Sequence, residues 1–181
     1  MERDIDVVEV VENLKKAFEN GGRTVAELLL EKNPYYYRGK NKLTGKTALH
    51  FAAEAGYVQV GALLVKYMSV DELEIIDNDG FTALARATSN GNFHMVKCML
   101  DRTTKLPTIQ NDKGNIPAVA ALFDGNLELA LYLYTRTPPE ILKPENGIKG
   151  PSVVCEAIYN KALSKNQLFD KKSSLSVLFP A

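Results

Sequence analysis

The sequence contains few of the residues that build disulfide frameworks and metal sites. It has two cysteines, Cys98 and Cys155, and two histidines, His50 and His94. The cysteines lie far apart and outside any C-x-x-C pattern, so they form neither a disulfide framework nor a zinc pattern, and they favour a reducing compartment. Two histidines exclude a histidine-rich metal site. We therefore predict no cofactor and no metal.

Net charge and long apolar runs are also absent. Lys plus Arg and Asp plus Glu number 22 each, so no overall field draws the chain to nucleic acid or to a membrane. No apolar run approaches the roughly 20 residues of a membrane-spanning helix, and the acidic start MERDIDVVEVV is unlike a secretory signal. We expect a soluble, cytoplasmic protein that binds no nucleic acid.

A pair of short helices is the clearest feature that is present. The stretch GKTALHFAAEAGYVQVGALLVKY, residues 45–67, predicts two helices joined at Gly56. Thr47 can cap the first helix, and Gly56 allows the left-handed turn between them. The second helix carries an apolar stripe that begins at Val58. Two helices this short cannot bury both apolar faces against each other, so the pair needs neighbours.

The hinge glycine recurs along the chain. Gly22, Gly56, Gly91 and Gly125 follow one another at intervals of about 34 or 35 residues. Thr82 stands at the second copy's equivalent of the capping Thr47. This regular spacing indicates an array of stacked repeats.

These residues resemble the ankyrin-repeat family, whose motif D-x-x-G-x-T-P-L-H-x-A-A-x-x-G has a period of about 33 residues. The first copy matches the motif well, the second has Ala85 in place of the histidine, and the third has Ile116 in place of the threonine. The resemblance implies an all-α fold, an ankyrin-repeat solenoid of stacked helix-turn-helix repeats with finger loops. The chain is most similar to plant ankyrin-repeat proteins whose longer members carry a C-terminal transmembrane domain, which we do not expect here. The segments LLEKNP, MSVDELEIIDNDG and GNLELALYLYTRTPPEIL carry that similarity.

We predict an ankyrin-repeat domain over residues 1–164 and an irregular tail over residues 165–181. The domain divides into a capping helix pair, three repeats and a partial fourth repeat: about 1–34, then 45–76, 80–110, 114–146 and 150–164. The capping pair closes the stack, so its outer face should be more polar than that of an internal repeat. Residues 35–44 should connect it to an extended finger. Ser69 and Glu72 have capping-box spacing and predict an extra helical turn.

The resemblance also implies a non-enzymatic protein that binds a partner through its concave face and fingers. The motif residues hold the scaffold, and the imidazole of His50 is expected to bridge neighbouring repeats; the positions are Thr47, His50, Gly56, Thr82, Gly91 and Gly125. The positions between them are free to bind: Lys46, Glu54, Ala55, Asn78, Asp79, Phe81, Ser89, Asn90, Lys113, Asn115, Phe123 and Asp124. We expect Phe81 to be the main anchor, an exposed aromatic on a rigid finger. The alternative is that its ring packs against Thr88 or the next finger.

A local basic cluster offers a second surface. Tyr36, Arg38, Lys40 and Lys42 lie within residues 33–53, which contain no acidic residue. Such a finger suits an acidic partner or an anionic membrane surface. The alternative is a solvated finger with a tyrosine packed beneath it.

Enzyme chemistry is not expected. GKNKLTGKT, residues 39–47, has five residues between its first glycine and GKT, where a phosphate-binding loop has four. No Ser/His/Asp set or carboxylate pair is apparent, so we predict no small-molecule substrate.

The sequence thus predicts a protein–protein interaction scaffold with an unidentified protein partner, in plant signalling or a stress or defence response. Two alternatives stay open. The chain could be the cytosolic portion of a membrane-anchored ankyrin signalling protein, or a truncated isoform that competes with a longer relative. Membrane contact would then be peripheral, at the cytoplasmic face, or confined to longer relatives.

Overall fold

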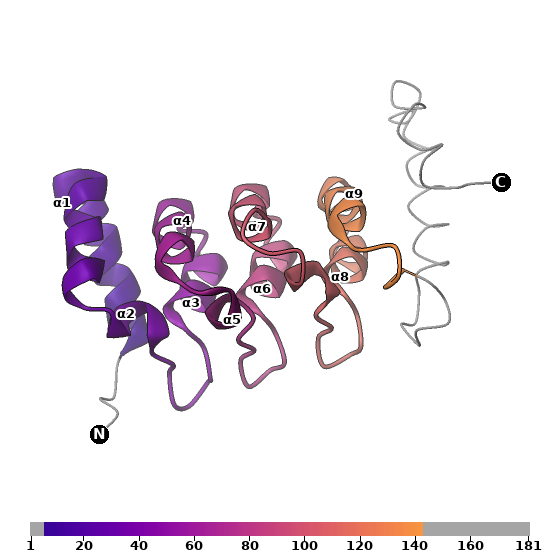
Figure 1. Cartoon of the computed structure of the whole chain (residues 1–181), viewed down its shortest axis with the longest axis horizontal. Helices are drawn as coiled ribbons and strands as arrows, with labels where there is room; N and C mark the ends of the chain where they lie inside the picture. Colours follow the sequence, from indigo (N-terminus) through magenta and orange to yellow (C-terminus); the bar gives the residue numbers. More distant parts are fainter. Residues whose placement is uncertain (1–5, 143–181) are drawn as a thin grey trace.

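A computed structural model describes residues 6–142, which form helices joined by loops. In chain order the elements are α1 (Val7–Lys32), α2 (Tyr35–Arg38), α3 (Ala48–Ala55), α4 (Val58–Tyr67), α5 (Val70–Leu73), α6 (Ala83–Ser89), α7 (Phe93–Leu100), the 3-10 helix η1 (Leu106–Thr108), α8 (Pro117–Phe123) and α9 (Leu127–Arg136). Successive helix pairs stand side by side, and the loops before α3, α6 and α8 project in one direction (Figure 1). The predicted all-α solenoid with finger loops is confirmed.

The helix pairs turn at glycines. Gly56 ends α3 with a φ of 71°, in the left-handed region that favours glycine, and its backbone N–H bonds to the carbonyl of Ala52. Gly91 and Gly125 follow α6 and α8 with φ values of 65° and 81°. Each turn folds an outer helix (α4, α7 or α9) back onto an inner helix (α3, α6 or α8).

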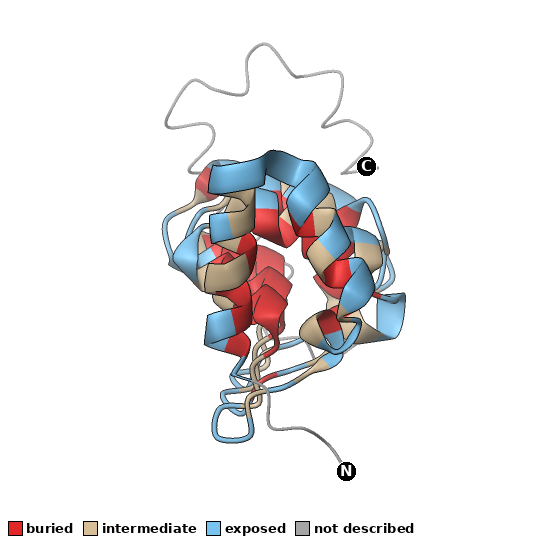
Figure 2. Ribbon diagram, turned by 90° about the vertical axis from the view of Figure 1, so that its left-hand side faces the viewer, coloured by how far each residue is buried: buried red, intermediate tan, exposed pale blue. Residues whose placement is uncertain are grey.

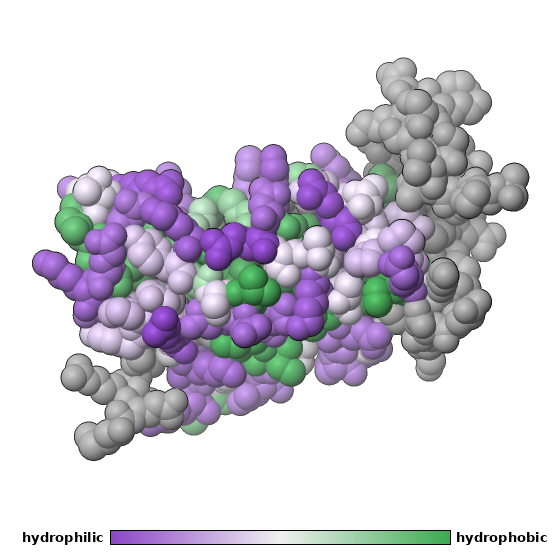
Figure 3. Space-filling view, in the orientation of Figure 1, coloured by the Kyte–Doolittle hydropathy of each residue, from purple (hydrophilic) through white to green (hydrophobic). Residues whose placement is uncertain are grey.

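The core lies between the inner and outer helices. Viewed along the stack, buried residues line the inward sides of both layers (Figure 2). Leu49, Leu63 and Leu64 are fully or almost fully buried, each worth about 1.5–3 kcal/mol relative to exposure. Gly61 of α4 packs closely against α7, because the Met95 thioether occupies the space where a Cβ would be. On the face drawn in Figure 3, hydrophilic residues predominate, with hydrophobic ones scattered between them.

The N-terminal helix pair is present, and its outer face includes accessible apolar side chains. α1 breaks at Gly22, whose φ of 68° and ψ of −168° are not helical, and Asp6 caps its start by accepting N–H bonds from Val8 and Glu9. The outer face is not purely polar, because Val25 and Leu28 are about half exposed. Ala26 and Leu30, in the same turns, are buried. The part of α1 after Gly22 therefore has apolar residues on both its inner and outer sides.

The connectors contain the short helical segments α2, α5 and η1. Ser69 and Glu72 form the predicted capping box of α5, with the Ser69 N–H bonded to Glu72 Oε2 at 2.7 Å and the Glu72 N–H to Ser69 Oγ at 3.2 Å. The expected extended connector at residues 35–44 is wrong in its first half, because residues 35–38 form α2. Pro34 precedes α2, since its fixed φ suits the start of a helix.

The C-terminal predictions are covered only in part. After α9 the chain forms a turn at residues 139–142, with the Ile141 N–H bonded to the Pro138 carbonyl at 3.0 Å. The partial fourth repeat at residues 150–164 and the tail at residues 165–181 lie outside the described residues.

Candidate protein-binding face

The fingers are tight turns built on side-chain acceptors. We number them finger 1 (residues 39–47), finger 2 (residues 75–82) and finger 3 (residues 109–116). In finger 2, Asp77 Oδ1 accepts the N–H groups of Asp79 and Phe81, each at 3.0 Å. In finger 3, Asn111 Oδ1 accepts those of Lys113 and Asn115 at 3.0 and 2.9 Å. The short polar side chains of Asp and Asn favour such turns.

Fingers 1 and 2 are joined through Asn78. Its backbone N–H bonds to the carbonyl of Thr44, and its side-chain amide bonds to the carbonyl of Leu43, both at 2.9 Å. Asn78 belongs to the predicted partner-binding set, but in the structure its side chain holds the neighbouring finger. The tip of finger 1 is therefore fixed against finger 2.

His50 joins the first two repeats. Its Nδ1 accepts the Thr47 N–H at 3.2 Å and lies 2.8 Å from Thr47 Oγ1, while Nε2 lies 3.0 Å from the carbonyl oxygen of Phe81. Because a carbonyl only accepts, Nε2 carries the proton and Nδ1 is the acceptor. Burial lowers the pKa of His50 below its ordinary value, so the ring is neutral at pH 7. The imidazole thus bridges two repeats without carrying charge.

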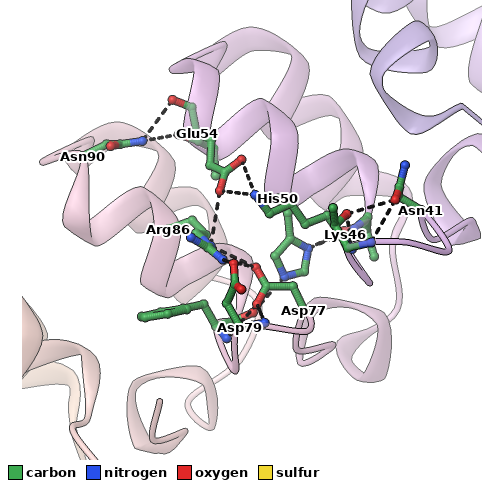
Figure 4. A network of polar contacts seen from close by, with 12 residues as sticks. Asn41, Lys46, His50, Glu54, Asp77, Asp79, Arg86 and Asn90 are labelled. Atoms are coloured by element: carbon green, nitrogen blue, oxygen red, sulfur yellow. Dashed lines mark hydrogen bonds and ion pairs between the residues drawn. The ribbon is translucent and has the colours of Figure 1, made fainter. Parts of the chain in front are cut away.

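A network of ion pairs surrounds this bridge (Figure 4). The Arg86 guanidinium of α6 donates to Asp77 Oδ2 through Nε at 2.9 Å and Nη2 at 2.6 Å, and Nη2 also lies 2.6 Å from Asp79 Oδ2. Arg86 Nε is 3.3 Å from Glu54 Oε1, and Lys46 Nζ bonds to the same oxygen at 2.7 Å. The charges therefore form one chain across the inner ends of the first two repeats.

The network is partly desolvated. The Asp77 side chain is fully buried, and that of Arg86 is 20% exposed. Burial alone would raise the pKa of Asp77, but the backbone N–H of Phe81 and the Arg86 guanidinium together hold it below its usual value. Burial works against the charge of Arg86 as well, yet Asp77 and Asp79 raise its pKa. Both groups are therefore charged at neutral pH.

Arg86 and Asp77 are absent from the residues predicted for the site. The sequence does contain a signal for this pair, because the turn at residues 77–80 is followed by an arginine one helical turn into the next helix. Three residues predicted to bind a partner are already engaged with charges of the protein itself, since Arg86 pairs with Glu54 and Asp79, and Lys46 pairs with Glu54. The ion pairs hold these three side chains together, so a partner would contact them as one polar surface.

Phe81 is not the exposed anchor that we expected. Its side chain is half-buried, and the Arg86 guanidinium lies over its ring, 4.6 Å from the centroid. The alternative was that the Phe81 ring packs against Thr88. The Thr88 hydroxyl makes no such contact, because it donates to the Leu84 carbonyl at 2.8 Å. The exposed aromatic of the predicted set is Phe123, at the end of α8, with 74% of its surface accessible.

The remaining predicted residues differ in availability. The Asn90 side-chain amide donates to the carbonyls of Ala53 and Glu54 at 3.2 and 3.0 Å and so braces α3. Asn115 is half-buried within finger 3. The others are exposed at the ends of inner helices or on finger 3: Ala55, Ser89, Lys113, Phe123 and Asp124. We call these five residues the open face.

The predicted basic finger is partly wrong. Tyr36 and Arg38 lie in α2, before finger 1 begins. Tyr36 is half-buried against the core, and Arg38 Nε pairs with Glu72 Oε1 of α5 at 3.2 Å. The acid comes from a distant connector, so the local sequence could not reveal it. Lys40 and Lys42 do lie on finger 1 and are exposed, beside Leu43 with 89% of its surface accessible.

Metal and membrane features can be stated for residues 6–142. Within this range, no group of three or more His, Cys, Asp or Glu side chains is arranged to hold a metal ion. None of the helices described there is both long and apolar enough to cross a membrane.

The fold and the site define a helical-repeat protein with projecting fingers. The family model for ankyrin repeats (three copies) matches residues 14–108, more than half of the chain. The chain belongs to the ankyrin-repeat family.

Similar proteins share only part of their length with this chain. Human and bovine SMC5-SMC6 complex localization factor protein 1 are each 31% identical to it over 107 residues, which is 59% of this chain. The match covers 10% of either relative, so this chain corresponds to a small portion of them. A chain in the crystal structure of the yeast ribosomal protein Rps3 in complex with its chaperone Yar1 superposes with a TM-score of 0.60. It is 19% identical, with 75% of this chain and 95% of that chain covered, and the likeness is one of fold.

Proposed function

We propose that this protein is a non-enzymatic scaffold that binds a partner protein through the open face. The observation that carries the proposal is Phe123, an aromatic side chain left 74% accessible at the end of α8. A large aromatic exposed on an ordered element gains contact area on binding at little entropic cost. The names of the similar proteins refer to protein assemblies, which supports a protein as the ligand.

The surroundings of Phe123 indicate the chemistry of that partner. Asp124 follows it directly and is exposed. We infer a partner segment that places an apolar or aromatic side chain on Phe123 and a basic side chain near the Asp124 carboxylate.

The broader role remains part of the proposal. The resemblance to plant ankyrin-repeat proteins favours a scaffold in signalling or in a stress or defence response. That role rests on the sequence segments that carry the resemblance.

Proximity labelling with the complete chain tests the proposal. Proteins labelled by the wild type should be lost with Phe123→Ala and reduced with Asp124→Lys. For a purified partner, the loss at Phe123 should be about 2 kcal/mol, as for a central aromatic. Val70→Ala in α5 is the matched control, because Val70 is also an exposed apolar residue but lies in a connector. Equal labelling by the Phe123 and Val70 variants would reject the open face.

The tip of finger 1 is a second candidate contact. Leu43 is almost fully exposed, directly after Lys42 and three residues after Lys40, a combination that suits an anionic membrane surface. Sedimentation with phosphatidylserine vesicles should then be lost in a Lys40→Glu, Lys42→Glu, Leu43→Asp variant. Equal sedimentation of the variant and the wild type would remove the membrane alternative.

A further inference from the structure

A groove lies on α1. This helix stands at the end of the stack opposite to α9 (Figure 1). The volume of the groove is about 530 Å³, and both halves of α1, before and after the break at Gly22, contribute to it. The lining residues come from the first half, Asn13, Lys16, Ala17 and Asn20, and from the second half, Val25, Leu28, Leu29 and Lys32. The break that makes the helix pair therefore also forms the groove.

The floor of the groove is apolar. Leu28 and Val25 are 48% and 45% accessible, and Ala17 and Leu29 are half-buried beside them. Terminal repeats of solenoids normally close the stack with a polar outer face. Accessible leucine and valine side chains at such an end are typical of a surface that another apolar face covers.

The rim of the groove is basic. Lys16 and Lys32 line it, and no acidic residue does. The other two cations of α1 have carboxylate neighbours, with Lys15 3.9 Å from Glu19 and Arg23 2.9 Å from Glu27. Among residues 6–142, Lys16 and Lys32 have no hydrogen-bond or ion-pair partner. Their charges are therefore available to a ligand that lies in the groove.

We propose that this groove binds a short amphipathic helix of a partner protein, with an apolar stripe against Leu28 and Val25 and acidic residues opposite Lys16 and Lys32. A helix presents such a stripe at i, i+3, i+4 and i+7, the spacing used when helices bind in grooves. The charges disfavour a second copy of this chain. A two-fold contact would set the lysines of one copy against those of the other, and like charges in contact repel.

A peptide-display selection against the complete chain tests this proposal. The probe is a library of helical peptides with a fixed leucine stripe and randomised flanking positions. The selected flanks should be rich in Asp and Glu. Affinity should fall about tenfold or more with Leu28→Asp and with the Lys16→Glu, Lys32→Glu variant, and it should weaken with added salt.

Val8→Asp is the matched control. Val8 is 44% accessible on the same helix but does not line the groove, so this variant should bind the selected peptides like the wild type. Both aspartate variants alter half-exposed positions and should keep the helical circular dichroism of the wild type. Phe123→Ala should also bind the peptides normally, which separates this site from the open face.

Three results would overturn the proposal. Selection could yield no binding helices, or helices without acidic flanks. Val8→Asp could weaken binding as much as Leu28→Asp does. Finally, sedimentation could show a dimer that Leu28→Asp dissolves, in which case a second copy occupies the groove.

Discussion

The two junctions between repeats use different chemistry on the same backbone plan. At the first junction, between the α3–α4 pair and the α6–α7 pair, polar side chains cross from one repeat to the next. His50 reaches the Phe81 carbonyl, Asn90 reaches the carbonyls of Ala53 and Glu54, and Arg86 lies 3.3 Å from Glu54. This junction has directional contacts in addition to its apolar packing.

Among residues 6–142, the second junction, between the α6–α7 pair and the α8–α9 pair, has no counterpart of these three side-chain contacts. At the positions of His50, Arg86 and Asn90 the next copies carry Ala85, Ala120 and Asp124. Its contacts include the rings of Phe93 and Tyr132, whose centroids are 4.7 Å apart. Stacking of helix faces is thus enough to hold a repeat, and of these two junctions only the first has the polar braces described above.

Removing Arg86 should have the largest effect on the difference between the two junctions. Arg86→Ala leaves the fully buried Asp77 carboxylate without its cation, and breaking a pair of this kind costs about 3 kcal/mol. Urea unfolding measures the loss. Arg136→Ala is the control, since Arg136 is exposed and lies over the Tyr132 ring, where about 0.5–1 kcal/mol is at stake. A loss no larger than the control's would show that the network is dispensable.

A double variant asks whether the cost comes from the unpaired charge. Finger 3 has Asn111 where finger 2 has Asp77, and Ala120 where α6 has Arg86. Asp77→Asn combined with Arg86→Ala copies that arrangement and keeps an oxygen to accept the backbone N–H groups. It should recover at least half of the stability that Arg86→Ala loses; no recovery would assign the loss to the packing of the arginine stem.

Removing the imidazole should be the next largest effect. His50→Ala leaves the Thr47 N–H and the Phe81 carbonyl without this partner in a buried site, at a cost of about 2 kcal/mol. Chemical denaturation with both histidine variants measures it. His94→Ala changes an exposed position and should stay within about 0.5 kcal/mol of the wild type. Similar losses for the two variants would mean that the bridge adds no stability.

Introducing a histidine bridge at the second junction should make the two junctions more alike. Ala85→His places an imidazole between the start of α6 and the carbonyl of Asn115, the counterpart of Phe81. One added buried hydrogen bond should raise the free energy of unfolding by about 1 kcal/mol. Thermal unfolding with a crystal structure of the variant measures both the gain and the contact. A destabilised variant would show that the alanine packing at this site is too close for the ring.

The smallest expected effect is the acid dependence of the first junction. The pKa of His50 is lowered in the folded state, so the unfolded state binds the proton more readily below about pH 6.5. Stability should therefore fall as the pH drops, by no more than about 0.7 kcal/mol between pH 7 and 6. Urea titrations of the wild type and His50→Gln test this, because the variant should lack that component. Parallel curves would place the titration elsewhere.

Much of the fold follows from local sequence rules. Hinge glycines such as Gly56 mark left-handed turns, and Ser69 with Glu72 specifies the start of α5, because both act within a few residues. α2 is not evident from the sequence, since Pro34 both stops the preceding helix and suits the start of the next one. The half-exposure of Leu28 is also not predicted from the sequence. A pattern of apolar residues that marks the buried side of a helix gives no information about the opposite side.

The site is less predictable because its contacts are distant in sequence. The family motif places the candidate positions on fingers and inner helix ends, and the exposure of Phe123 and Asp124 agrees with that placement. No spacing rule pairs Arg86 with Glu54, or Arg38 with Glu72. These ion pairs decide which candidates are open to a partner and which are engaged.

The uneven bracing also has a mechanical consequence. A solenoid pulled at its two ends carries the same tension through every junction, so the order of rupture depends on how each junction resists. Hydrogen bonds such as those from His50 to Phe81 and from Asn90 to Ala53 must break before the first two repeats separate. At the second junction, Ala85 and Ala120 make no side-chain hydrogen bond. Under load, the second of these two junctions, between α7 and α8, should therefore part before the first.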